Sequence, residues 1–407
     1  MRVLLANNYH YLRGGSERVY FELAGLLREK GHDTGFFSVS DPQCETNPYQ
    51  DFFVSPISFD TGQGWKVKLR TAGRMLYSKE AVHKLQALLG RESFDVLHAH
   101  NIYHRVNPVI FKVARKRGMP TAMTMHDYKL GCSVYNFFRN GEICTECLEK
   151  GRHRVFRNRC TKGSTSLSAF HWMEASLHHW LGIYRKNVDA FICPSRFSAR
   201  MHVRAGLPEQ NVHYLPNFVH VDHFQPKETP GEYFVYAGRL AAEKGTETLL
   251  QAIRSAEVPL KFAGTGPLLE SLKKKAQRFD MKQVDFLGHL DSAGMDALLK
   301  NARALILPSE WFENAPMSIL EAFATGVPVI GADIGGIPEM VLPGKTGQLH
   351  ASGDAESLAE ALVELWRNPD AAFAMGRNAR RMAEEVFSPG VHYQGLRRIY
   401  QHIGVAA

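Results

Sequence analysis

The chain has 407 residues, of which 44% are hydrophobic and 22% charged, as in an ordinary soluble globular protein. This composition excludes a disordered chain, a collagen-like chain and a small disulfide-stabilised scaffold. No apolar run approaches the ~18 residues of a membrane span, and at ~150 residues per domain the length predicts two or three domains.

The charge is unevenly distributed. Residues 1–217 hold 30 basic and 18 acidic residues, whereas residues 218–407 hold 19 and 23. Two halves of opposite sign indicate different partners, and a basic half suits an anionic lipid, a phosphorylated substrate or a nucleic acid. A solvated surface is the alternative. The apolar core of residues 1–8 is too short for a signal peptide, so we interpret it as a strand and expect a cytoplasmic protein.

In the first half, short apolar runs alternate with amphipathic segments. Residues 3–6 form a predicted strand, followed by a loop with Gly14 and Gly15 and by a helix that ends near Gly31. This alternation is typical of parallel βαβ units. Further predicted strands cover residues 96–99, 120–125 and 190–193.

The same alternation restarts after residues 216–217 and a predicted linker at 219–230. It predicts two doubly wound α/β domains, whose ligands bind beyond the carboxyl ends of the strands, in a central cleft. The predicted domains are residues 1–217, residues 218–387, and a last helix at 388–407 that crosses back to the first domain. Predicted strands in this half cover residues 233–237, 260–263, 284–287, 304–307 and 328–330, and predicted helices cover 317–324 and 355–366.

Two cations follow the strand at 233–237. Arg239 and Lys244 precede a helix that begins near Thr246. Two cations beside a helix N-terminus can bind a diphosphate. Taken alone, the pair is equally well explained as two surface cations.

Two glutamates flank another predicted helix start. Pro316 suits a first helical turn, so Glu313 lies before the helix and Glu321 inside it. The unpaired amides of that turn favour an anion. A carboxylate such as Glu321 can accept hydrogen bonds from sugar hydroxyls. Taken singly, each glutamate is better explained as a charge near a helix terminus.

Three motifs occur together: Gly-Arg-Leu-x-x-Glu-Lys-Gly at 238–245, Gly-x-Gly-Pro at 264–267 and Glu-x7-Glu at 313–321. In this order they resemble the retaining family 4 glycosyltransferases, most strongly over residues 233–345. The resemblance implies a glycosyltransferase-B fold: an α/β protein with two Rossmann-like domains facing a central cleft that holds a nucleotide-sugar. Many relatives have Phe-Gly where this chain has Ala315-Pro316.

The resemblance also implies roles for individual residues. Arg239 and Lys244 would hold the donor diphosphate, and Glu321 would bind the ribose. In the first domain, Gly14 and Gly15 resemble the family's glycine loop, and His126 resembles the histidine that contacts the donor sugar. The implied catalytic residues are His126, Glu313, Arg239 and Lys244. Further implied donor contacts are Glu313 with the backbone of Asn314, Ala315, Pro316 and Met317, and the nucleobase near Gly264 and Gly288. His98, His100 and Asn101 lie at another predicted strand end, and this location suggests that they help to shape the acceptor site.

The predicted function is a retaining hexosyltransferase that uses a UDP- or GDP-sugar in surface polysaccharide or glycolipid synthesis. The acceptor would be a glycan or a lipid-linked glycan. No Asp-x-Asp occurs in the chain, so we expect metal-independent catalysis without a cofactor, with Arg239 and Lys244 stabilising the leaving diphosphate. One alternative is a nucleic-acid-binding module with a zinc knuckle, although no recognition helix stands out in this sequence. The other is a nucleotide-sugar epimerase of the same fold.

A basic insert at about 130–165 contains four cysteines, Cys132, Cys144, Cys147 and Cys160. Their spacing, with a C-x2-C pair, predicts a structural zinc; reduced thiols packed in a loop are the alternative. Residues 112–162 hold 12 basic and 4 acidic residues, and Trp65, Lys66, Lys68, Arg70 and Arg74 form an aromatic and basic stretch. We therefore expect peripheral binding to an anionic membrane surface, on its inner face.

Overall fold

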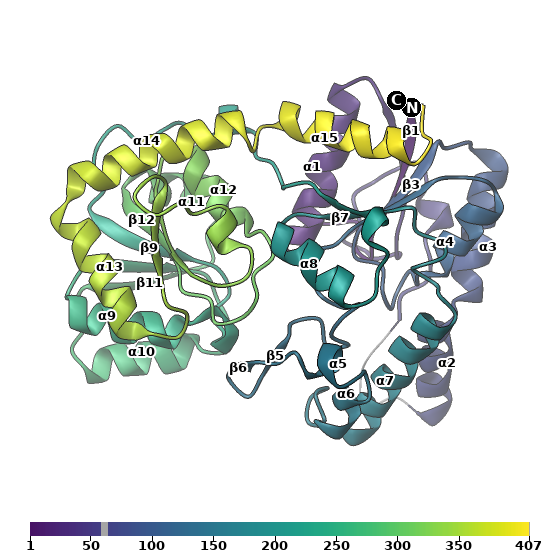
Figure 1. The fold of residues 1–407 in the computed structure, drawn as a ribbon, viewed down its shortest axis with the longest axis horizontal. Coiled ribbons are helices and arrows are strands. Elements are labelled where there is room, and N and C mark those ends of the chain that lie inside the picture. Colours follow the sequence, from purple (N-terminus) through teal and green to yellow (C-terminus); the bar gives the residue numbers. More distant parts are fainter. Residues whose placement is uncertain (58–63, 407) are drawn as a thin grey trace. The chain divides into compact units, whose positions relative to one another are not determined.

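The computed structural model describes residues 1–57 and 64–406, and its chain divides into two compact units (Figure 1). Unit 1 comprises Met1–Asn136, Thr145–Leu215 and Tyr393–Ala407, and unit 2 comprises Phe137–Cys144 and Pro216–His392.

Unit 1 is built on a six-stranded parallel sheet. Its strand order is 2-1-3-4-7-8, so the direction in which successive strands are added reverses between β1 and β3. In doubly wound sheets, ligands bind at the carboxyl end of such a reversal. The strands are β1 (Arg2–Ala6), β2 (Asp33–Phe37), β3 (Val96–Ala99), β4 (Thr121–Thr124), β7 (Ala190–Cys193) and β8 (Val212–Tyr214).

Helices cover both faces of this sheet (Figure 1). Side chains alternate along β1, so Val3 and Leu5 enter one hydrophobic core while Leu4 and Ala6 enter the other. Among the described residues, no helix is long and apolar enough to cross a membrane. The unit 1 helices are α1 (Gly15–Glu29), α2 (Trp65–Leu76), α3 (Lys79–Arg91), α4 (Val109–Lys116), α5 (Glu146–Glu149), α6 (Arg154–Arg157), α7 (Thr165–Trp180) and α8 (Arg196–Arg204), with short 3-10 turns η1 (Gln50–Phe52) and η2 (Glu209–Asn211).

Unit 2 has a second six-stranded parallel sheet, of order 11-10-9-12-13-14, and a separate two-stranded hairpin. Here the order reverses between β9 and β12, as in dinucleotide-binding domains. The strands are β9 (Tyr233–Ala237), β10 (Leu260–Ala263), β11 (Val284–Gly288), β12 (Ala302–Leu307), β13 (Val329–Ala332) and β14 (Gly347–His350), and the hairpin is β5 (Phe138–Arg139) with β6 (Glu142–Ile143).

The unit 2 sheet also separates two cores. Phe234 and Tyr236 of β9 point into one core, and Val235 points into the other. The helices are α9 (Thr246–Ala256), α10 (Leu269–Arg278), α11 (Ser292–Lys300), α12 (Met317–Ala324), α13 (Ala355–Arg367) and α14 (Pro369–Glu385), with 3-10 turns η3 (Val221–His223), η4 (Ala242–Lys244) and η5 (Ile337–Glu339). The last helix, α15 (Pro389–His402), begins in unit 2 and belongs to unit 1 from Tyr393 on.

The units differ from the predicted domains in three places. The predicted linker at 219–230 is wrong, because Val219 and Val221 are buried in a core of unit 2 and Lys227 donates to the Ala302 carbonyl. The hairpin from the basic insert belongs to unit 2, where Phe137 is buried and its ring lies 6.2 Å from that of Phe312. Finally, α15 divides between the units after His392.

Candidate functional site

The turn after β9 carries Lys244 to the end of β12, and Gly245 makes this approach possible. Gly245 has a left-handed φ of +65°, and a Cβ built on it would lie 1.8 Å from the Pro308 carbonyl oxygen. Only glycine accepts both the backbone conformation and the proximity. The predicted cation is thereby fixed at the reversal point of the unit 2 sheet.

Lys244 forms an ion pair with Glu313, with Nζ 2.7 Å from Oε1. The same oxygen accepts hydrogen bonds from Ser309 Oγ at 2.7 Å and Trp311 Nε1 at 2.8 Å. Lys244 Nζ also lies 4.7 Å from the Trp311 ring centroid. Burial by itself would raise the pKa of Glu313, but Lys244 and the two hydrogen-bond donors hold that pKa below its ordinary value. Glu313 is therefore a buried carboxylate anion that orients Lys244.

Arg239, the second predicted cation, is exposed and forms an ion pair with Glu243, four residues further on. Its backbone carbonyl accepts a hydrogen bond of 2.8 Å from the hydroxyl of Tyr236. The backbone of Arg239 is thus anchored to the buried part of β9, while its guanidinium remains accessible.

The loop before α12 presents the predicted backbone contacts. Asn314, Ala315, Pro316 and Met317 are half-buried, and α12 begins at Met317 after Pro316, whose side chain makes no capping hydrogen bond. Its first amides can thus receive an anion. Glu321 is half-buried, one turn inside the helix.

The loop is held from the other side by a pair of glycines. Gly336 N–H donates to the Glu313 carbonyl at 2.8 Å, and a Cβ on Gly335 would lie 2.4 Å from the same oxygen. The predicted nucleobase contacts lie at the ends of β10 and β11. There the Gly264 N–H donates to the Gly288 carbonyl at 2.6 Å, and a Cβ on Gly264 would lie 1.9 Å from the Gly238 carbonyl oxygen.

In unit 1, Gly14 and Gly15 lie at the start of α1. Neither has a positive φ, and a Cβ on Gly15 would meet nothing within 4 Å. The fold of unit 1 therefore does not require glycine at position 15. The open space leaves room for a ligand to approach the backbone.

Three histidines form a row at the carboxyl ends of β3 and β4. His126 Nε2 lies 2.9 Å from His100 Nδ1, and the rings of His100 and His98 stack at 4.9 Å. His98 hydrogen-bonds to Tyr400 and Thr124. Burial lowers the pKa of His126 to about 4, so its imidazole is neutral at pH 7. His98 and His100 are themselves buried and support His126, so any part they have in shaping the acceptor site stays a prediction.

The four insert cysteines do not form a recognisable ligand set. Within residues 1–57 and 64–406, no three His, Cys, Asp or Glu side chains are grouped so that they could hold a metal ion. Cys132 is buried, and Cys144, Cys147 and Cys160 are half-buried.

Sequence reasoning missed Trp311 and assigned no role to Ser309, at a predicted strand end, or to Glu243, within the 238–245 motif; these three residues position the two cations. Ser309 and Trp311 lie at the end of β12, next to the predicted motif, and this location is the signal that could have identified them.

Comparison with protein families gives two matches. A model described as "Glycosyltransferase Family 4" matches residues 13–223, and one described as "Glycosyl transferases group 1" matches residues 221–382. Together they include the predicted motifs of both units.

Curated relatives match mainly in part. D-rhamnosyltransferase WbpZ of Pseudomonas aeruginosa is 31% identical over 41% of this chain, and O-antigen chain mannosyltransferase C of Escherichia coli is 30% identical over 40%. Each alignment spans 44% of the relative's length. N-acetyl-alpha-D-glucosaminyl L-malate synthase of Bacillus anthracis is 21% identical, over 92% of this chain and 90% of its own.

Solved structures share the fold over the whole chain. HepE of Anabaena in complex with UDP has a TM-score of 0.71 at 16% identity, covering 99% of this chain and all of its own. Sucrose-phosphate synthase of Thermosynechococcus elongatus has a TM-score of 0.70 at 18% identity, with full coverage of both chains. These neighbours have the glycosyltransferase-B fold, so the predicted fold is confirmed: two parallel-sheet α/β domains. With one family model matching more than half of its residues, the chain belongs to glycosyltransferase family 4.

Proposed function

We propose that this protein transfers a hexosyl group from a nucleotide diphosphate sugar to a glycan or lipid-linked acceptor. The observation that carries the proposal is the Lys244–Glu313 pair, next to the uncapped start of α12, at the reversal point of the unit 2 sheet. Two cations and a helix start form a suitable site for a diphosphate. The named activities of WbpZ and mannosyltransferase C, and the UDP bound to HepE, support a nucleotide-sugar donor.

The proposed reaction retains the anomeric configuration and needs no metal. The bond between the sugar C1 and the diphosphate oxygen breaks, and the acceptor hydroxyl oxygen bonds to C1 on the same face. The acceptor proton passes to the departing phosphate. Arg239, Lys244 and the first amides of α12 stabilise the negative charge that develops on the diphosphate.

The other predicted residues position the donor. Glu321 accepts hydrogen bonds from the ribose hydroxyls, and the backbone of residues 314–317 contacts the sugar. The neutral imidazole of His126 can donate or accept a hydrogen bond to a sugar hydroxyl. In unit 1, the open space beside Gly15 lets the donor or the acceptor approach the backbone closely.

A thermal-shift screen of nucleotides and nucleotide-sugars tests donor binding, because a ligand that binds only the folded state raises the melting temperature. We expect a UDP- or GDP-sugar to produce the largest shift and to be consumed only when an acceptor is present. Binding of nucleic acid without any nucleotide-sugar, or release of an epimerised sugar, would contradict glycosyl transfer.

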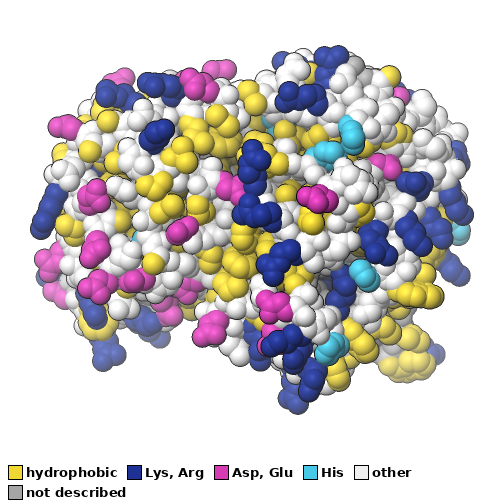
Figure 2. Space-filling model, in the orientation of Figure 1, with side chains coloured by type: hydrophobic (Ala, Val, Ile, Leu, Met, Phe, Trp, Pro, Cys, Tyr) yellow, Lys and Arg dark blue, Asp and Glu magenta, His cyan; other side chains and the backbone are white. Residues whose placement is uncertain are grey.

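We also propose that unit 1 binds an anionic membrane surface through α2, α6 and α7. Helix α7 packs against both other helices. Trp65 of α2 is 71% exposed and Trp180 of α7 is 77% exposed. Lys66 and Arg70 follow Trp65 in α2. In Figure 2, hydrophobic side chains and Lys and Arg side chains lie side by side over this part of the unit. Large exposed apolar side chains flanked by cations suit an anionic bilayer.

Vesicle flotation tests this surface. We expect the protein to float with vesicles that contain phosphatidylglycerol and not with pure phosphatidylcholine, and Trp65→Ser with Trp180→Ser to reduce flotation. Phe279→Ser, at an exposed apolar side chain of unit 2, is the control. Equal flotation of both variants would contradict the assignment.

We propose separately that Cys132, Cys144, Cys147 and Cys160 hold a structural zinc; the support is their C-x2-C spacing alone, since residues 1–57 and 64–406 show no ready-made group of three ligands. Metal analysis of the purified protein, with and without Cys144→Ser, tests this. A chain that carries no zinc when purified would overturn it.

A further inference from the structure

Helix α7 has an inverted distribution of side chains. Its buried residues are the polar Ser168, Glu174 and His178, while apolar side chains such as Trp172 and Trp180 are exposed. An ordinary surface helix buries its apolar side. A buried polar stripe is costly unless its groups are paired or serve a binding site.

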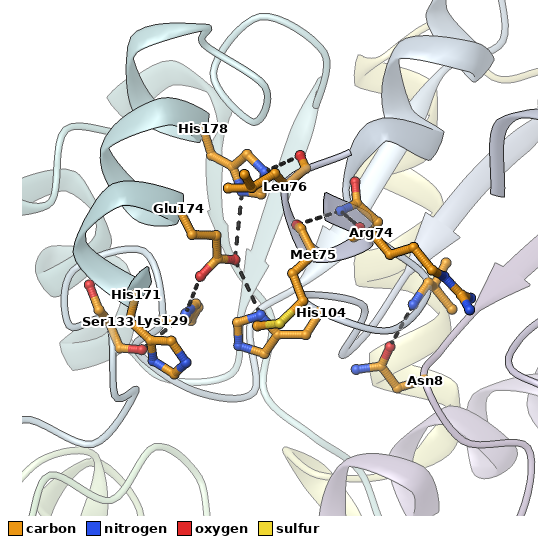
Figure 3. Close-up of polar contacts among 12 residues, drawn as sticks. Asn8, Arg74, Met75, Leu76, His104, Lys129, Ser133, His171, Glu174 and His178 are labelled. Atoms are coloured by element: carbon orange, nitrogen blue, oxygen red, sulfur yellow. Dashed lines mark hydrogen bonds and ion pairs between the residues drawn. The ribbon is translucent and has the colours of Figure 1, made fainter. Parts of the chain in front are cut away.

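The stripe centres on Glu174, which is 1% exposed (Figure 3). Its carboxylate lies 3.1 Å from Lys129 Nζ and 3.2 Å from His104 Nδ1, and His178 approaches it at 3.8 Å. Lys129 also donates to the Ser133 carbonyl at 3.0 Å. Burial by itself would raise the pKa of Glu174, but Lys129 and His104 hold it far below its ordinary value. The charges of Glu174 and Lys129 therefore compensate each other.

This pair lies in the wall of a pocket within unit 1. Three further basic groups, Arg152, His179 and Arg185, line the same pocket. Tyr184 and several small or apolar residues complete the walls.

Among the described residues, Arg152, His179 and Arg185 have no carboxylate partner, in contrast to Lys129 and His178. Arg152 donates only to backbone carbonyls, those of Leu130 at 3.2 Å and Ala205 at 3.3 Å. Within the described ranges 1–57 and 64–406, neither Arg152 nor Arg185 forms an ion pair. Burial lowers the pKa of Arg152; the nearby Cys147 thiol opposes this shift, and the charge of Arg185 adds to it. Burial and the charges of both arginines lower the pKa of His179. Since Glu174 is already paired with Lys129, the pocket carries uncompensated positive charge.

We propose that this pocket binds a phosphate ester, with Arg152, Arg185 and His179 as its ligands. Arginine matches the oxygens of a phosphate with paired N–H donors. The exposed Trp180 and Leu181 immediately precede pocket residue Gly182 in the chain. The phosphate ester can therefore come from a soluble ligand or from a lipid headgroup, and the two sources are separated by experiment. This inference does not depend on the proposed transfer reaction.

Arg185 provides the decisive variant, because its side chain is exposed and a substitution there spares the core. Arg185→Glu is compared with Lys186→Glu, which makes the same charge change at the next residue, also exposed but outside the pocket lining. Melting temperatures are measured to establish that both variants are folded. Binding is titrated by calorimetry with inorganic phosphate and glycerol 3-phosphate, with sodium chloride at matched ionic strength as the blank.

Loss of a charge-assisted contact predicts at least about tenfold weaker phosphate binding for Arg185→Glu and no change for Lys186→Glu. Lys244→Ala, which affects the donor site, should leave this binding intact, so failure of either site is recognised separately. Equal affinity of Arg185→Glu and the wild type both in this titration and for the vesicles described next, or an equal loss in Lys186→Glu, would overturn the proposal.

Vesicles of phosphatidylcholine with phosphatidic acid separate the two sources. If vesicle binding alone requires Arg185, the ligand is a lipid phosphate, and if phosphate or glycerol 3-phosphate binding alone requires it, the ligand is soluble. If neither requires Arg185, the pocket is not a phosphate site.

Discussion

Lys244 and Glu313 are 69 residues apart in the chain, yet the Lys244 ammonium nitrogen lies 2.7 Å from Glu313 Oε1. Ser309 and Trp311 donate to the same carboxylate oxygen. This arrangement gives Glu313 a role in orienting Lys244, in addition to the sugar contact that the family resemblance implies. Three side chains, those of Glu313, Ser309 and Trp311, thus hold the Lys244 cation where the proposed function requires a diphosphate.

Replacing Lys244 should lower both the stability and the catalytic rate, and a second substitution at Glu313 should separate the two effects. Lys244→Met leaves the buried Glu313 carboxylate unpaired, which costs about 3 kcal/mol of folding free energy. It also removes a charge that stabilises the leaving group, and we expect kcat to fall about 10²- to 10³-fold. Adding Glu313→Gln should restore most of the stability but not the activity.

Urea unfolding and steady-state kinetics of the two single variants and the double variant measure both effects. Lys273→Met, at an exposed cation of α10, serves as the control. Recovery of activity in the double variant would mean that Lys244 does not act on the donor.

The lowered pKa of Glu313 predicts a pH-dependent part of stability. Because the carboxyl pKa is lower in the folded state, its stabilisation is complete above the unfolded value of about 4.3 and is lost as the pH falls through the folded value. The wild type should therefore lose more stability than Glu313→Gln on acidification from about pH 6 to pH 3. Parallel curves for the two proteins would show that Glu313 is not held as an anion.

The imidazole of His126 should remain neutral well below pH 6.5. Its pKa of about 4 in the folded state lies below that of an unfolded histidine, so the contribution of His126 to stability is present above about pH 6.5 and declines toward pH 4. Nitrogen-15 NMR of the imidazole groups measures this directly. Titration of His126 near pH 6.5 would contradict the buried hydrogen bond to His100.

Two glycines should respond oppositely to alanine. Gly245→Ala places a methyl group on the Pro308 carbonyl and forces a positive φ, so the melting temperature should fall strongly. Gly15→Ala meets no atom within 4 Å, so its melting temperature should be unchanged or higher. If ligand approaches the start of α1, Gly15→Ala should nevertheless weaken substrate binding, which saturation kinetics measure. Wild-type KM values in Gly15→Ala would argue against a ligand there.

Much of the fold could be predicted because local patterns determine it. Strands β9, β10 and β11 are short apolar runs, and each ends at or next to a glycine (Gly238, Gly264 and Gly288). Residues 317–324 form a helix with the predicted bounds. The stretch at 219–230 was misjudged because its prolines suggest a linker, whereas Val219 and Val221 fill a core that only the tertiary structure reveals.

The site was predicted only in part, for a similar reason. The motif residues lie at strand ends, as the alternation of strands and helices indicates. The pairing of Lys244 with Glu313 and the support of His126 by His100 join distant segments, and no local signal in the sequence indicates such pairs. The same holds for the hairpin of the basic insert, which packs in unit 2 through Phe137.

Titration of UDP and GDP against the wild type and Arg239→Gln tests the diphosphate site most directly. The Arg239 side chain is 64% exposed, so its replacement should leave the fold intact. We expect one of the two nucleotides to bind, about tenfold more weakly in Arg239→Gln and unchanged in Lys273→Gln. Binding of neither nucleotide, or equal affinity of Arg239→Gln and the wild type, would contradict a diphosphate held by the Arg239 and Lys244 cations.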